Sequence, residues 1–199
     1  MTECLIGIRF NNFILMASDG NGGRSIVCMR NDVDKIYELS DKLALGICGD
    51  SGDTVSFAEF ILQNVQLYKI RNGYEMSPSA AAHFTRRQLV DTLRTRNAYH
   101  VNLLLGGMDK TGVPSLYFMD YLGSIVNVPF AIHGYGSYVS LSVLDRKYNP
   151  NMSKDEAVKL LHDCIKEIQK RFVYNLSNFK VKLIDDQGIS FLEDVAVGK

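Results

Sequence analysis

Short apolar runs separated by turn residues dominate the first quarter of the chain. Residues 4–10 and 13–18 run apolar or alternate apolar with polar positions, and Asn11-Asn12 lies between them. That pattern predicts a β-hairpin. The same quarter is expected to continue with a flexible turn at residues 20–23 and with short strands at residues 25–29, 35–39 and 43–48. The chain therefore begins as a strand-rich segment.

Two stretches with helical spacing of apolar residues come next. The first is expected to begin near Asp50 or Ser51 and to stop at Asn72-Gly73, since glycine often ends a helix in a left-handed conformation. The second is expected to begin at Ser77-Pro78 and to run to about Arg96, because serine is a good cap and proline suits the first helical position. The positions expected to face the core are Phe57, Phe60, Ile61, Val65 and Tyr68 in the first helix and Leu89 and Leu93 in the second.

The second half repeats this order of strands followed by helices. Gly134-Tyr135-Gly136 should introduce a third helix, on which Tyr138, Leu141 and Leu144 form an apolar stripe. The capping box Ser153-Lys-Asp-Glu156 predicts the start of a fourth helix, whose apolar stripe is the most regular in the chain. Strands are expected at residues 99–105, 115–119, 124–126 and 130–133, and a last hairpin at residues 179–184 and 189–192.

This order of elements indicates an α+β fold. Two pairs of amphipathic helices alternate with groups of strands, and such faces are buried by stacking in layers. We therefore expect a four-layer αββα sandwich, with two sheets inside and a helix pair outside each. The chain has 199 residues and no segment that resembles a linker, so a single domain over residues 1–199 is expected.

Composition and charge argue against several classes of function. The chain has 22 Lys and Arg residues and 22 Asp and Glu residues, so its net charge gives no attraction to nucleic acid or to an anionic membrane surface. The four cysteines are not spaced for zinc and are expected to be free thiols, and the four histidines are scattered, so no metal or other cofactor is expected. No signal peptide or membrane-spanning stretch is recognisable. We therefore expect a protein of the cytoplasm and nucleus that binds neither nucleic acid nor membrane.

The candidate chemistry lies at the ends of the early strands, at Asp19, Lys35 and Gly49. A terminal threonine can act as a nucleophile because its hydroxyl attacks while its free α-amine accepts the proton. A lysine keeps such a site electropositive, an aspartate holds the lysine, and a backbone N–H beside a glycine stabilises the oxyanion. In this spacing, and onward through the Gly134-Tyr135-Gly136 turn to the final hairpin, the chain resembles the β-type subunits of the proteasome core particle. The resemblance implies the sandwich fold of the N-terminal nucleophile hydrolases.

The chain departs from the family at the nucleophile. The family's threonine precedes its aspartate by sixteen residues, and here that position is taken by Glu3, whose carboxylate cannot attack as an alkoxide would. Tyr135 replaces a serine of the family, and Asn175 and Asn178 stand where active members have an aspartate and a serine. The resemblance therefore implies that no residue is catalytic. It leaves Asp19, Lys35 and Gly49 as the remnant of a catalytic frame, with the Asp19–Lys35 pair retained as a structural ion pair.

An active threonine hydrolase is the alternative function. Removal of Met1 would expose Thr2 as an N-terminal threonine. A shift of one residue along a strand turns a side chain to the opposite face of the sheet, so we expect Thr2 to point away from Lys35. Cys4 would have no free amine, because three residues precede it. A monomeric binding domain is a third hypothesis, which the resemblance along the whole chain disfavours.

The resemblance also implies the partners. They are other proteasome α and β subunits in stacked seven-membered rings, with assembly chaperones and the regulatory particle as indirect partners. The chain would help to assemble the β ring and to wall the proteolytic chamber in ubiquitin-dependent protein degradation, while other subunits cleave the substrate. The tail at residues 193–199 is expected to reach a neighbouring subunit.

Overall fold

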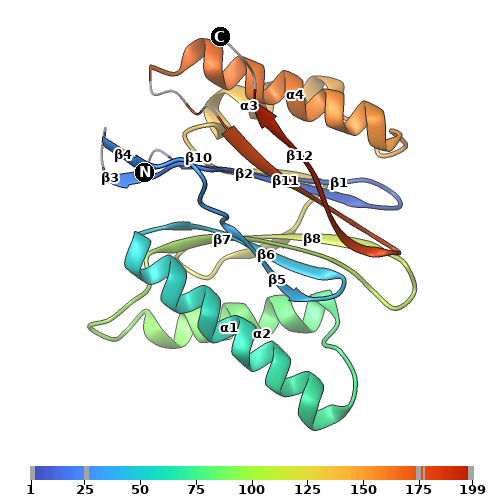
Figure 1. The fold of residues 1–199 in the computed structure, drawn as a ribbon. Helices are drawn as coiled ribbons and strands as arrows, with labels where there is room; N and C mark the ends of the chain where they lie inside the picture. Colours follow the sequence, from blue (N-terminus) through green and yellow to red (C-terminus); the bar gives the residue numbers. More distant parts are fainter. Residues whose placement is uncertain (1–2, 25–26, 174–175, 177, 197–199) are drawn as a thin grey trace.

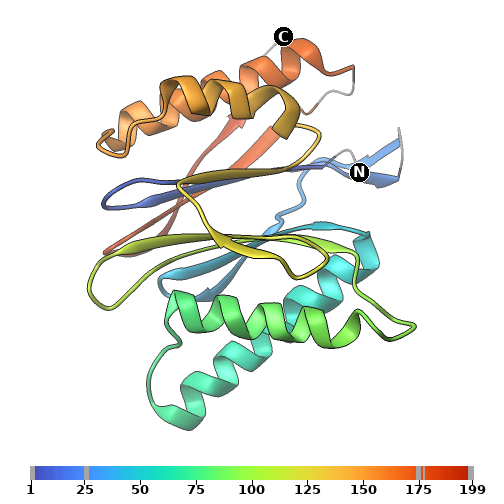
Figure 2. The same cartoon turned by 180° about the vertical axis from the view of Figure 1, so that it is seen from behind.

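Two five-stranded sheets lie face to face, and a pair of helices covers the outer face of each (Figure 1). Figure 2 shows the same four layers from behind. The structure is a computed structural model that describes residues 3–24, 27–173, 176 and 178–196. The expected α+β fold, a four-layer αββα sandwich, is confirmed.

The first sheet joins the two ends of the chain. Its strands lie in the order β10-β1-β2-β11-β12, and all neighbours are antiparallel. The bounds are β1 (Cys4–Arg9), β2 (Ile14–Asp19), β10 (Phe130–Gly134), β11 (Asn178–Asp185) and β12 (Gly188–Ala196). The central strand is β2, and every one of its residues is buried. Asp19, its last residue, therefore sits deep inside the molecule.

The second sheet has the order β5-β6-β7-β8-β9 and is also antiparallel. Its bounds are β5 (Ile36–Ser40), β6 (Leu43–Gly49), β7 (Val101–Met108), β8 (Pro114–Met119) and β9 (Ile125–Asn127). All seven residues of β6 are buried, down to Gly49 at its end. The edge strand β5 begins one residue after Lys35, so Lys35 and Gly49 meet at one end of this sheet.

A small hairpin, β3 (Gly22–Arg24) with β4 (Val27–Arg30), lies beside the sandwich. The prediction of a flexible turn at residues 20–23 was wrong, since Gly22 and Gly23 pair with β4. The reason is that strand pairing uses only backbone groups. A side chain at Gly23 would overlap the carbonyl oxygen of Val27, so glycine permits this close approach.

The predicted helix ends were largely confirmed. Gly73 ends the first helix in the left-handed conformation, Ser77 accepts a hydrogen bond from the Ala80 N–H, and Ser153 forms the capping box with Glu156. The second helix ends at Thr92 rather than near Arg96. The bounds are α1 (Ser51–Asn72) and α2 (Pro78–Thr92) over the second sheet, and α3 (Ser137–Lys147) and α4 (Lys154–Arg171) over the first. Within the described ranges, no helix has the length and apolar character needed to cross a membrane.

Three residues predicted to be buried in helices are exposed instead: Phe60, Tyr138 and Leu141. A spacing of three residues drifts by about 60° at each step around a helix of 3.6 residues per turn. In α3 only Leu144 of the predicted stripe therefore reaches the sheet. In α1 the buried positions are Phe57, Ala58, Ile61 and Val65.

His133 is a polar side chain buried between the two sheets. Its Nε2 lies 3.0 Å from the carbonyl oxygen of Leu103 in β7, and its ring stacks on Phe118 with centroids 4.3 Å apart. Because a carbonyl oxygen only accepts, Nε2 carries the proton of the neutral imidazole. Burial lowers the pKa of His133 to about 4.

Stability should therefore fall in mild acid. The unfolded chain gains a proton on this imidazole below about pH 6.5, whereas the folded chain resists it down to about pH 4. The contribution of His133 is thus fully present above pH 6.5 and is lost as the pH falls toward 4. We expect the free energy of unfolding, measured with urea, to drop by about 1 kcal/mol from pH 7.5 to 5.5 because of this group. His133→Gln should flatten that part of the profile, and His162→Gln, at an exposed position, should leave it unchanged.

Candidate functional site

The ammonium group of Lys35 contacts two carboxylates beside the start of the N-terminal strand β1. Lys35 Nζ lies 2.9 Å from Asp19 Oδ2 and 3.1 Å from Glu3 Oε1. The side chains of Lys35, Asp19 and Glu3 are 7%, 1% and 22% exposed. Because water is largely excluded, these attractions are stronger than those of a surface ion pair. The predicted Asp19–Lys35 contact is therefore present, and Glu3 is its third member.

Asp19 is held by backbone groups as well as by Lys35. Its Oδ1 accepts the Cys4 N–H at 2.7 Å, and its Oδ2 accepts the Asn21 N–H at 3.2 Å. Burial raises the pKa of Asp19 above its ordinary value, although Lys35 and the Cys4 N–H favour the carboxylate. Burial alone would lower the pKa of Lys35, but the carboxylates of Asp19 and Glu3 outweigh it and raise that pKa above its ordinary value. Lys35 is thus a cation at neutral pH.

The backbone N–H of Gly49 also contacts the Glu3 carboxylate. It donates a 2.8 Å hydrogen bond to Glu3 Oε2. Two residues earlier, Ile47 N–H donates to the carbonyl oxygen of Lys35 at 3.0 Å. The N–H groups on one edge of a strand are two residues apart. The Gly49 N–H therefore faces the same edge as the Ile47 N–H, toward β5, but it lies beyond the residue at which β5 begins. A side chain at Gly49 would overlap the carbonyl oxygen of His100, so the close approach of β7 requires glycine here.

The Glu3 carboxylate therefore contacts two donors, the Lys35 ammonium group and the Gly49 N–H. One oxygen faces the Lys35 ammonium and the other faces the Gly49 N–H. A carboxylate only accepts hydrogen bonds and has no proton to give up to a base. Sequence reasoning placed Glu3 at the nucleophile position but did not predict that it contacts Gly49.

A cleft of about 790 Å³ opens in front of these residues. Glu3, Lys35 and Gly49 line it, together with Asp50, Ser51 and Gly52 around the start of α1. The apolar part of its wall consists of Met29, Val33, Tyr37, Ile47 and Val55. Glu3, Lys35 and Gly49 are thus accessible from an open cleft rather than sealed in the core.

A second buried lysine, which sequence reasoning missed, holds β5 from the opposite sheet. Lys182 Nζ in β11 lies 2.6 Å from the Ile36 carbonyl oxygen, 3.0 Å from Asp34 Oδ2 and 3.1 Å from Glu38 Oε1. The signal in the sequence is a lysine between Val181 and Leu183 in an apolar strand. Since Lys182 fixes the residues on both sides of Lys35, it supports the position of that ammonium.

Of the other site positions predicted from the sequence, the structure describes Tyr135 and Asn178. Tyr135 is half-exposed, and its ring contacts those of Tyr138 and Phe172 at centroid distances of 6.3 and 6.4 Å. Asn178, the first residue of β11, donates from Nδ2 to Asp194 Oδ2 at 3.3 Å. Thr2 and Asn175, like Met1, lie outside the described residues.

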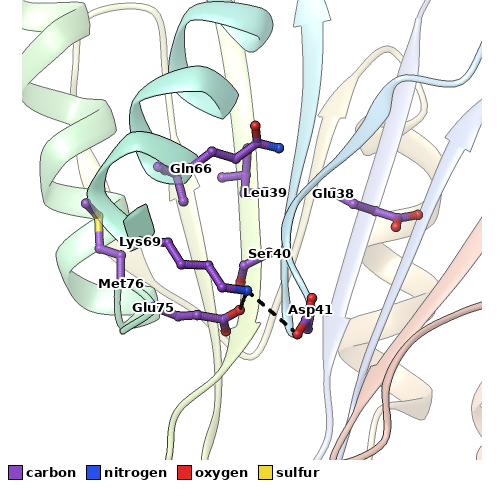
Figure 3. A pocket seen from close by; sticks show the side chains of 9 residues that line it. Glu38, Leu39, Ser40, Asp41, Gln66, Lys69, Glu75 and Met76 are labelled. Atoms are coloured by element: carbon purple, nitrogen blue, oxygen red, sulfur yellow. Dashed lines mark hydrogen bonds and ion pairs between the residues drawn. The ribbon is translucent and has the colours of Figure 1, made fainter. Parts of the chain in front are cut away.

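A smaller cavity of about 250 Å³ lies between α1 and the β5–β6 turn. Figure 3 shows Lys69 extended between Glu75 and Asp41. Its Nζ lies 2.6 Å from Glu75 Oε1 and 3.9 Å from Asp41 Oδ2. Its ammonium therefore faces a carboxylate on each side. In the part of the chain that the structure describes, no three His, Cys, Asp or Glu side chains are grouped as a metal site requires. All four cysteines are free thiols in the structure.

Comparison with known proteins identifies the family of the chain. The model of the family described as "Proteasome subunit" matches residues 2–184. Proteasome subunit beta type-4 of Saccharomyces cerevisiae is 39% identical over 193 residues, which cover 96% of this chain and 98% of the yeast protein. Proteasome subunit beta type-2-B of Arabidopsis thaliana is 42% identical over 186 residues, which cover 94% of this chain and 93% of the plant protein. The chain therefore belongs to the proteasome subunit family, as a β-type subunit.

Proposed function

We propose that this β-type subunit is non-catalytic and has a structural role in the proteasome core particle. The observation that carries the proposal is the position of the Glu3 carboxylate, in contact with both Lys35 Nζ and the Gly49 N–H. A threonine hydrolase needs a hydroxyl and a free α-amine at this point. Glu3 supplies neither. Asp19, Lys35 and Gly49 are, in this proposal, a remnant frame that now stabilises the N-terminal strand, and Tyr135, Asn175 and Asn178 are further departures from the active family members.

Membership of the family implies assembly with other proteasome subunits. We propose, from the resemblance, that the chain forms one domain over residues 1–199 and occupies the fourth β position of a seven-membered ring. There it would contact β neighbours, the α ring and the opposite β ring, and would wall the chamber used in ubiquitin-dependent degradation. Assembly chaperones and the regulatory particle would be indirect partners. The cytoplasm and the nucleus are the proposed locations.

Substitution of Thr2 separates this role from an active hydrolase. Particles purified through a tagged copy of the chain should co-migrate as a very large complex with peptidase activity. Thr2→Ala particles should retain every peptidase activity at the wild-type level per particle, because no step uses Thr2. Loss of one activity in fully assembled Thr2→Ala particles would contradict the proposal. Equal amounts of particle, measured by native gel, provide the control for assembly.

A further inference from the structure

We propose that Lys35 Nζ and the Gly49 N–H form a carboxylate receptor, and that Glu3 is its built-in ligand. The inference rests on the proposed non-catalytic role and concerns which group occupies the two donors of that site. In native protein the receptor is filled from within the chain. A carboxylate entering from the cleft, such as the C-terminus of a peptide, can bind only if Glu3 leaves.

The two donors converge on one ligand from different elements. Lys35 approaches from the start of β5, and the Gly49 N–H approaches from the end of β6. They meet the two oxygens of Glu3 at 3.1 and 2.8 Å, which is hydrogen-bond distance for both. A carboxylate is the smallest group that presents two anionic oxygens to two such donors. The helix α1 begins two residues after Gly49, and the positive end of its dipole favours an anion in the same place.

Both donors are held in place by contacts that do not involve Glu3. Lys35 remains bound to Asp19, and the segment around it is fixed by Lys182. Gly49 is held by the β6–β7 pairing, and Asp50 N–H donates to the His100 carbonyl oxygen at 3.2 Å. The receptor should therefore persist when the Glu3 carboxylate is removed. An unfilled Gly49 N–H beside a cation would then attract a carboxylate from solution.

The test is amide hydrogen exchange at Gly49 in assembled particles, measured by mass spectrometry. Glu3→Ala should speed exchange of this amide by about tenfold or more, because a charge-assisted hydrogen bond is lost. Sodium acetate should restore most of the protection in Glu3→Ala particles, and sodium chloride of equal ionic strength should not. Wild-type particles should respond to neither salt, because a carboxylate on the same chain has a high effective concentration.

Two further variants complete the test. Glu3→Ser also lacks the carboxylate and should respond to acetate as Glu3→Ala does, so the result does not depend on one variant entering the particle. Glu3→Gln retains an oxygen that can accept the Gly49 N–H, so it should stay protected and be indifferent to acetate. Exchange in Glu3→Ala and Glu3→Ser at the wild-type rate, or equal protection by acetate and chloride, would overturn the inference.

These results are independent of the test of the proposed function. If sodium acetate did not restore protection of the Gly49 amide, the receptor would be disproved and the proposed non-catalytic role would be unaffected. Loss of a peptidase activity in Thr2→Ala particles would remove the non-catalytic role, whatever the exchange rate at Gly49.

Discussion

Replacing Lys35 by methionine is expected to lower the free energy of unfolding by about 3–5 kcal/mol. The substitution keeps much of the side-chain volume but leaves Asp19 and Glu3 as two carboxylates without their shared cation. Asp19 is 1% exposed, so water cannot take over that role. The measurements are urea unfolding of the full-length chain and the fraction of tagged chain that enters the large complex.

Lys159→Met is the matched control, because Lys159 is exposed on α4. It should change stability by less than about 0.5 kcal/mol, as surface substitutions usually do. If Lys35→Met were as mild as Lys159→Met, Lys35 would not be a buried partner of two charges. Peptidase activity per assembled particle should be unchanged in both variants, because the proposed role of Lys35 is structural.

Replacing Gly134 by alanine is the other substitution with a large expected effect. Gly134 has φ +85°, a left-handed conformation that costs a residue with a side chain about 1–2 kcal/mol. Its new methyl group would also overlap the carbonyl oxygen of Glu3, the residue just before β1, which pairs with β10. Moving a packed backbone adds about 1–3 kcal/mol. We therefore expect a total loss of about 2–5 kcal/mol in urea unfolding.

Gly73→Ala separates these two contributions. Gly73 has φ +75° at the end of α1, and nothing lies within 4 Å of the position that its side chain would take. This variant should lose only the conformational part, about 1–2 kcal/mol. If Gly134→Ala and Gly73→Ala lost the same free energy of unfolding, the turn at Gly134 would not be in tight contact with the N-terminal strand.

The architecture was largely predictable because local patterns specify it. The capping box at Ser153, the left-handed Gly73 and the buried stripe of α4 depend on residues only three or four positions apart. The Asp19–Lys35 contact was predictable from its spacing in a known family. Burial on α1 and α3 was predicted less well, since Phe60 and Tyr138 are apolar yet exposed. Such outward apolar residues break the link between hydrophobicity and burial on which the prediction depended.

The contacts of Glu3 could not be derived from the sequence. Glu3 and Gly49 are 46 positions apart, and their hydrogen bond depends on where β5 begins relative to β6. The Lys182 cluster likewise depends on the register between two sheets that the chain reaches far apart in its sequence. The sequence indicated which side chain occupies the nucleophile position, and the fold determines which donors it meets.

The non-catalytic role is tested most directly by intact-mass measurement of this subunit after assembled particles have reacted with a covalent probe directed at N-terminal threonines. We predict that catalytic β subunits of the same particle gain the mass of the probe and that this chain gains none. A mass gain located on Thr2, in chains that have lost Met1, would contradict the account.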